Sequence, residues 1–187
     1  AETDKPLANA EYEIYASEDI IIGNVLKHKK GELLDAVKTD ADGKAISTLL
    51  FLGKYEVKEK TAPYGYVLDT TVYSVELTYQ GQEIEVFTKS LPVTDTPQKA
   101  KIELIKTDEE TKKPLANAEY GIYAYADIIV NGETKVTAGT LVDTVKTDAD
   151  GKATSKELYL GEYLVKELTA PKDYVLSDEE HIVTLEY

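Results

Sequence analysis

The sequence repeats itself with a period of 108 residues, and this repeat constrains the fold more than any other feature. The segment "PLANAEY" begins at Pro6 and again at Pro114, and "VKTDADGKA" recurs at the same spacing. Residues 2–79 match residues 110–187 without a gap. A period of this length exceeds the unit of a solenoid, so each copy is expected to have a hydrophobic core of its own.

The repeat predicts two tandem domains, residues 1–97 and 98–187. Apolar and polar residues alternate in many short segments, a pattern typical of half-buried strands joined by polar turns. This favours an all-β fold made of two β-sandwiches. The segment "SEDIIIGNV" at 17–25 is the candidate for a short helix. The predicted strands cover residues 10–16, 33–39, 44–50, 55–59, 71–79, 83–88, 91–95 and 102–107.

The two copies start and stop at different points of the repeat. The strand over 102–107 precedes "PLANAEY" in the second copy, whereas its counterpart in the first copy would fall before Ala1. The first copy continues through Asp95, whereas the second stops at Tyr187. We therefore expect a first domain without its first strand, a second domain without its last strand, and a natural polypeptide that extends in both directions.

Composition excludes several classes of function. The formal net charge of -14 argues against nucleic acid or an anionic membrane as a partner. The absence of cysteine excludes disulfides and thiolate chemistry, and no apolar run is long enough to span a bilayer. His28 and His181 do not correspond in the repeat, so no shared metal or catalytic site is expected. "TDADG" resembles the start of a calcium loop but lacks the distal glutamate, so a β-turn is the better interpretation, and no cofactor is expected.

Ionisable residues share the apolar faces of three predicted strands. Glu59 continues the face of Tyr55 and Val57, and Glu167 takes the same place in the second copy. Lys106 continues the face of Ile102 and Leu104, and Asp95 that of Leu91 and Val93. Because burying a lone charge is costly, an intact repeat would have to bring one lysine, one glutamate and one aspartate together.

These residues lie in segments that resemble a known family. "IELIKTDEETKKPLANAEYGIYA", "VKTDADGKA" and "YLVKELTAP" resemble the CnaB-type, prealbumin-like domains of Gram-positive surface adhesins and pilins, over nearly the whole chain. In that family a first-strand lysine forms an intramolecular isopeptide bond with an Asn or Asp of the last strand, promoted by a buried glutamate. The resemblance implies that Lys106 is the lysine, Glu59 and Glu167 are the glutamates and Asp95 is the acceptor, although Asn is the commoner acceptor.

The chemistry sets further expectations. Burial should lower the pKa of the lysine, which is nucleophilic when neutral, and raise that of the glutamate, which can then shuttle protons. The reaction runs once, so the chain is not expected to be an enzyme with turnover. The alternative is that the lysine and the carboxylates form only ion pairs, which give no dependable stability when buried. Neither copy contains all three groups, so strand addition by another chain is a further hypothesis.

The resemblance implies a stalk or spacer of an extracellular bacterial surface protein, anchored to the cell wall through a segment outside this sequence. Its partners would be neighbouring repeats of the same polypeptide. The alternative function is a ligand-binding adhesin module that recognises host matrix or glycan through its loops. The two copies differ most in one such loop, residues 17–32 in the first copy and 125–140 in the second.

Overall fold

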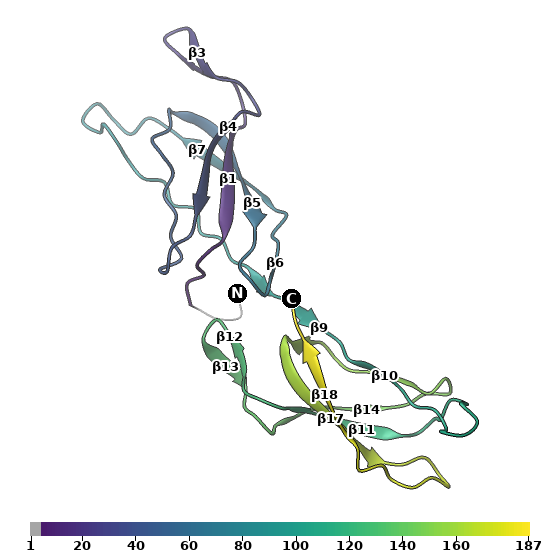
Figure 1. The fold of residues 1–187 in the computed structure, drawn as a ribbon. Helices are drawn as coiled ribbons and strands as arrows, with labels where there is room; N and C mark the ends of the chain where they lie inside the picture. The colour runs from purple at the N-terminus through teal and green to yellow at the C-terminus, as the bar shows by residue number, and fades with distance from the viewer. Residues whose placement is uncertain (1–4) are drawn as a thin grey trace. The chain divides into compact units, whose positions relative to one another are not determined.

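The computed structural model describes residues 5–187, and these residues form strands, turns and loops without a helix (Figure 1). Within this range there is accordingly no helix that could cross a membrane. The chain divides into two compact units, Ala1–Thr96 and Pro97–Tyr187. The prediction of an all-β chain is confirmed.

The strands are short in both units. In the first unit they are β1 (Glu11–Ala16), β2 (Ile20–Ile22), β3 (Val25–His28), β4 (Leu33–Lys38), β5 (Gly53–Thr61), β6 (Tyr66–Val67), β7 (Val72–Leu77) and β8 (Thr96–Pro97), which ends on the first residue of the second unit. In the second they are β9 (Lys99–Ala100), β10 (Glu103–Ile105), β11 (Glu119–Ala124), β12 (Ile128–Val130), β13 (Glu133–Val136), β14 (Leu141–Lys146), β15 (Lys152–Thr154), β16 (Leu158–Tyr159), β17 (Gly161–Thr169) and β18 (Glu180–Leu185).

Each unit is built on an antiparallel four-stranded sheet with the same topology. The order is β4-β1-β5-β7 in the first unit and β14-β11-β17-β18 in the second. Alternate residues of the central strands are buried, as the period of two requires. On β5 and β17 this face ends with Glu59 and Glu167, which are 7% and 5% exposed. The sheet therefore carries a carboxyl group into the interior of each unit.

The two units differ in how completely their cores are covered. In the second unit, β10 pairs antiparallel with β15, and Ile102, the residue before β10, lies in the core. The first unit has no strand in the corresponding position within residues 5–187. Its buried core cluster is limited to Ile14, Ala16, Ile20 and Tyr55, whereas that of the second unit comprises Ile102, Ile122, Ala124, Ile128, Val145, Ala153, Leu158, Tyr163 and Val165.

Several predicted strands of the first unit are wrong. Residues 44–50, 83–88 and 91–95 form no ladder with the described strands. The second copy shows the reason for 44–50, because the matching residues become β15 and β16 only where β10 and β9 pair with them. An alternating pattern makes a strand only when a neighbour supplies the hydrogen bonds.

The short helix predicted over 17–25 is also wrong, because β2 and β3 form an antiparallel hairpin there. The turn is Gly23-Asn24, both with positive φ (54° and 63°). Two such residues between β-branched segments are the typical two-residue turn of a hairpin.

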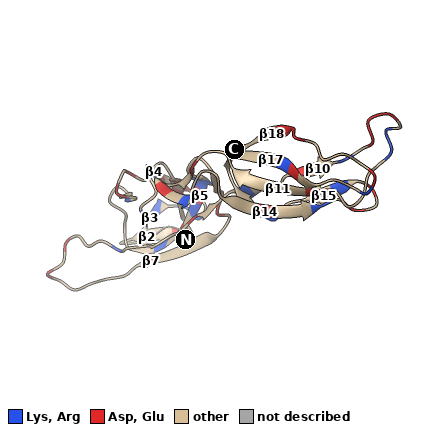
Figure 2. Cartoon of the chain, turned by 90° about the horizontal axis from the view of Figure 1, so that it is seen from below, with Lys and Arg blue, Asp and Glu red and all other residues tan. Residues whose placement is uncertain are grey.

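The "TDADG" segments are turns, as predicted. Asp40 Oδ1 accepts hydrogen bonds from the backbone N–H groups of Asp42 and Lys44, each at 2.9 Å, and Asp148 makes the same bonds in the second unit. These aspartates therefore bind their own backbone. Charged residues elsewhere are spread over strands and loops of both units (Figure 2).

Candidate functional site

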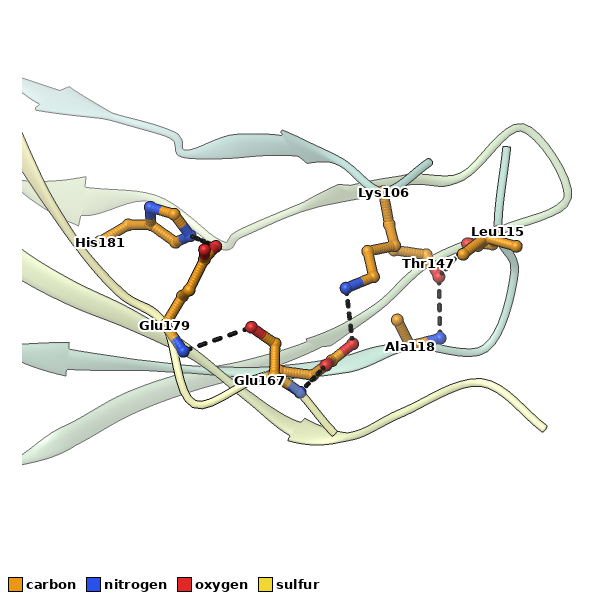
Figure 3. Close-up of polar contacts among 8 residues, drawn as sticks. Lys106, Leu115, Ala118, Thr147, Glu167, Glu179 and His181 are labelled. Carbon is orange, nitrogen blue, oxygen red and sulfur yellow. Dashed lines mark hydrogen bonds and ion pairs between the residues drawn. The ribbon is translucent and has the colours of Figure 1, made fainter. Parts of the chain in front are cut away.

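The second unit brings Lys106 and Glu167 together (Figure 3). Lys106 Nζ lies 3.2 Å from Glu167 Oε1, and the two side chains are 23% and 1% exposed. The other carboxylate oxygen, Oε2, accepts a hydrogen bond of 2.8 Å from the backbone N–H of Ser177. The Lys106 ammonium also lies over the ring of Tyr120, 5.9 Å from its centroid. The buried Glu167 carboxylate of β17 is thus paired with the ammonium of Lys106, the residue that follows β10.

The backbone around Gly151 positions Lys106. The Lys106 N–H donates to the Gly151 carbonyl at 2.7 Å, and the Lys106 carbonyl accepts from Leu115 N–H at 2.9 Å. Gly151 has φ +70°, and a Cβ there would fall on the Lys106 carbonyl oxygen. A glycine is therefore required for this close approach.

A buried threonine connects the segment before β11 to the end of β14. Thr147 Oγ1 accepts from Ala118 N–H at 2.9 Å and donates to the Leu115 carbonyl at 2.8 Å (Figure 3). Thr39 makes the matching pair of bonds in the first unit. The repeated "PLANA" and "KTD" motifs are therefore explained by this connection, which holds the chain next to the site.

The pKa of Lys106 departs from the sequence-based expectation. Burial lowers it, but the Tyr120 hydroxyl and the Glu167 carboxylate beside the ammonium outweigh that effect and leave the pKa above its usual value. The expectation of a lowered lysine pKa is therefore wrong for this chain. The contact with Glu167 therefore favours the ammonium form of Lys106 in the resting ion pair.

The first unit holds the carboxyl groups without the lysine. Glu59 Oε2 accepts a 2.7 Å hydrogen bond from Asp69 N–H, the counterpart of the bond from Ser177. Its Oε1 is buried and has no hydrogen-bond partner of good geometry within residues 5–187. Asp95 is 3% exposed and lies close enough to raise the pKa of Glu59 by charge repulsion.

Both carboxyl groups of the first unit have raised pKa values. Burial raises the pKa of Glu59, and the nearby Asp95 and Asp69 add to the effect, against opposing hydrogen bonds from Asp69 N–H and Tyr12. Burial likewise raises the pKa of Asp95, with a further contribution from Asp69. The expected rise of the glutamate pKa is thus confirmed for Glu59.

The structure therefore groups the four predicted residues in pairs. Glu59 lies near Asp95 in the first unit, and Lys106 is paired with Glu167 in the second. Sequence reasoning missed Tyr12 and Tyr120, which border the two sites, and the backbone N–H groups that hold the glutamates. The tyrosines could have been found, since both end the repeated segment "ANAEY" on the buried face of a strand.

Comparison with known proteins identifies the family. The family model SpaA, a prealbumin-like fold domain, matches residues 1–90 and 100–187. The chain belongs to this family. Its two units are prealbumin-like domains, as the sequence predicted.

The relatives of these prealbumin-like domains are much longer proteins. The chain is 35% identical over 79 residues to the trypsin-resistant surface T6 protein of Streptococcus pyogenes serotype M6, and 31% identical over 88 residues to a collagen adhesin of Staphylococcus aureus. These matches cover 42% and 46% of the chain but only 12% and 7% of the relatives. The solved structure of the Bacillus anthracis TIE protein matches 99% of the chain and 29% of its own length, with a TM-score of 0.64 and 28% identity.

Proposed function

We propose that the chain is a stalk segment of an extracellular surface protein of a Gram-positive bacterium, and that each complete repeat is cross-linked by an amide bond between lysine and aspartate. The observation that supports this most strongly is the burial of Glu59 and Glu167 at equivalent positions, one beside an aspartate and the other beside a lysine. The names of the relatives, a surface protein and an adhesin, agree with the cellular location.

The proposed reaction joins Lys Nζ to the Asp side-chain carbon and releases water. In the ion pair seen here, Lys106 first transfers a proton to Glu167, which leaves a neutral amine and a neutral acid. The amine attacks the side-chain carbon of the protonated Asp. The glutamate then returns its proton to the departing hydroxyl and takes one from the nitrogen, and the bond between the Asp carbon and that hydroxyl breaks. Water leaves, and the glutamate is again a neutral carboxylic acid, as it was after the first proton transfer.

The two units each support one half of this scheme. The raised pKa values of Glu59 and Asp95 favour protonated carboxyl groups, and a protonated Asp is the better electrophile. The contact between Lys106 and Glu167 provides the short proton transfer. A covalent connection between separate strands would resist force, because unfolding could not separate them, and it would resist reduction, unlike a disulfide.

The chain itself provides the material for a test. Tyr187 corresponds to Tyr79 in the repeat, so adding a second copy of residues 80–97 after Tyr187 completes the second unit. We call this variant the extended chain. Its intact mass should be lower than the calculated mass by one water molecule, and Glu167→Gln should restore the full mass. A full mass in the folded extended chain would refute the cross-link.

A second candidate function, binding of a ligand to the loops, is favoured by one observation. The β2–β3 hairpin exposes Ile21 (57%) and Val25 (54%), and at the end of β3 remote from the turn Lys27 Nζ lies over the Phe51 ring, 5.7 Å from the centroid. Binding of the chain to a matrix-protein or glycan array, lost on Val25→Asp, would support this function over a spacer.

A further inference from the structure

The β2–β3 hairpin of the first unit is a ribbon with apolar side chains on both faces. Ile21 lies opposite Leu26, and Ile22 lies opposite Val25. Neighbouring residues of a strand point to opposite faces, so each face of the ribbon carries one of these two pairs. All four side chains are exposed, by 40% to 57%. The hairpin extends beyond the end of the sheet of its own unit (Figure 1).

This exposure is a property of the hairpin and does not come from a missing neighbour. In the second unit, where β9 and β10 precede the sheet, the matching hairpin β12–β13 is exposed in the same way. Ile129, the counterpart of Ile21, is 59% exposed, and Thr134, the counterpart of Leu26, is exposed as well. The hairpin also follows the end of β1 at Ala16, remote from the end of that strand that pairs with Glu59.

The second hairpin is polar where the first is apolar. Its strand β13 places Thr134 opposite Ile129 and Glu133 opposite Val130, so each apolar residue of β12 shares its face with a polar one. Residues 20–26 of the first hairpin carry no charged side chain at all. The hairpin fold therefore does not require the second apolar strand, and the apolar side chains of β3 call for another explanation.

Only a medium that surrounds the ribbon can remove both of its faces from water. A flat protein surface would cover one face and leave the opposite pair exposed. Scattered apolar residues on a surface are ordinary, but an uncharged segment with four of them on two faces indicates a site of interaction. Removal of this apolar surface from water would drive the association.

Basic residues lie behind the apolar end of the hairpin. Lys27 is about 7 Å behind Val25 along β3, at about 3.3 Å per residue, and Lys29 and Lys30 follow directly after that strand. Amphipathic helices at a membrane surface bury their apolar face about 5–10 Å deep. A ribbon inserted to the same depth would place these ammonium groups at the level of the lipid phosphates.

The carboxylates near the base of the hairpin are bound by groups of the chain itself. Glu32 Oε2 accepts from Lys29 N–H at 2.9 Å, and its Oε1 lies 3.1 Å from His28 Nδ1. Asp19 Oδ1 accepts from Lys30 N–H at 2.8 Å. Within residues 5–187, the side-chain ammonium groups of Lys29 and Lys30 form no ion pair. They are therefore available to an external phosphate.

We propose that the β2–β3 hairpin inserts into the surface of a zwitterionic phospholipid bilayer, with its four apolar side chains at the boundary between headgroups and acyl chains and its three lysines on the phosphates. The net charge of -14 opposes a strongly anionic bilayer but not a zwitterionic one. Insertion stays shallow, because the outer edges of a two-stranded ribbon keep backbone groups that need water. The inference goes beyond the proposed function and does not depend on the cross-link.

The test mixes the full chain with vesicles of phosphatidylcholine and measures both sedimentation with the vesicles and hydrogen exchange. The bound fraction should rise to saturation with lipid concentration. Exchange should slow at residues 20–26 and stay unchanged at the matching residues 128–134. Ile21→Asp should lower the partition coefficient at least about tenfold, since a charge would have to leave water.

The second hairpin supplies the matched control. Ile129→Asp changes an equally exposed residue at the equivalent position and should leave vesicle binding unchanged. The double substitution Val25→Glu/Leu26→Thr gives the first hairpin the residues that the second one has, and it should release the chain from the vesicles. The second unit forms its hairpin with these residues, so this variant should remain folded.

The other outcomes would overturn the proposal. Equal losses on Ile21→Asp and Ile129→Asp, or no protection at residues 20–26, would refute insertion of this hairpin. Binding that requires anionic lipid and disappears at high salt would show adsorption through the lysines alone. Without vesicle binding, dimers that dissociate on Ile21→Asp would assign the ribbon to a second copy of this chain, and binding to a protein or glycan array would assign it to that ligand.

Discussion

The same substitution at the two equivalent glutamates should have different effects on stability. Glu167→Gln removes the ion pair with Lys106, whose Coulomb energy at 3.2 Å is about 5 kcal/mol at an effective dielectric constant of about 20. Desolvation of both groups offsets much of this energy, and the Lys106 side chain, 23% exposed, can partly return to water. We expect a loss of about 2 kcal/mol in the free energy of unfolding of the second unit at pH 7, within the range for a charged hydrogen bond.

Glu59→Gln should cost little or stabilise. Within residues 5–187 no ion pair joins Glu59 to a cation, and burial together with Asp95 raises its pKa, so folding disfavours its charged form. A glutamine oxygen can still accept the hydrogen bond from Asp69 N–H. The free energy of unfolding of the first unit should therefore stay within about 1 kcal/mol of the parent value, on the stabilising side.

Hydrogen exchange is the suitable assay, because it reports the opening of each unit separately in the full chain. Amides of β1 and β5 report on the first unit, and those of β11 and β17 on the second. Equal losses of protection in the two variants would refute the reasoning, since they would show that the glutamates do not differ in their electrostatic surroundings. Glu56→Gln, on the opposite face of β5, serves as the control for a change of net charge.

Three further predictions follow from the same contacts. Because burial raises the pKa values of Glu59 and Asp95, the stability they contribute is complete below their unfolded pKa values and is lost as pH rises through the folded ones. The first unit should therefore gain stability as pH falls from neutral toward the unfolded values, and Glu59→Gln should flatten this dependence in a pH series of hydrogen exchange. Gly151→Ala should destabilise the second unit by about 1–3 kcal/mol in urea unfolding, since the residue has φ +70° and its Cβ would displace the strand at Lys106; an unchanged midpoint would contradict the close approach. Tyr163→Phe should cost about 1–2 kcal/mol in the same assay, because Tyr163 is 1% exposed and its hydroxyl donates to the Tyr159 carbonyl at 2.8 Å; a loss below about 0.5 kcal/mol would contradict this.

The sheet framework could be predicted because its signal is local. Alternation of apolar and polar residues over 10–16 and 55–59 is enough to predict β1 and β5 and to place Glu59 on the inner face. The 108-residue repeat then transfers each assignment to the second copy. These predictions depend only on residues that are neighbours in the sequence.

The predictions that failed depended on partners distant in the sequence. Residues 44–50 have the pattern of a strand, but in the first unit no described strand pairs with them. The pKa of Lys106 depends on Tyr120 and Glu167, which no count of apolar neighbours could have identified. The hairpin at 20–28 is an exception, because its signal is local: Gly23-Asn24 between two apolar segments is typical of a two-residue turn, and the predicted helix ignored it.

The most direct measurement is the location of the covalent bond in the extended chain. Tandem mass spectrometry of a proteolytic digest should find one branched peptide, in which Lys106 is joined to the aspartate that corresponds to Asp95 in the added segment. Glu167→Gln should abolish it. Unmodified peptides at both positions, in an extended chain whose added segment is protected from exchange, would contradict the account.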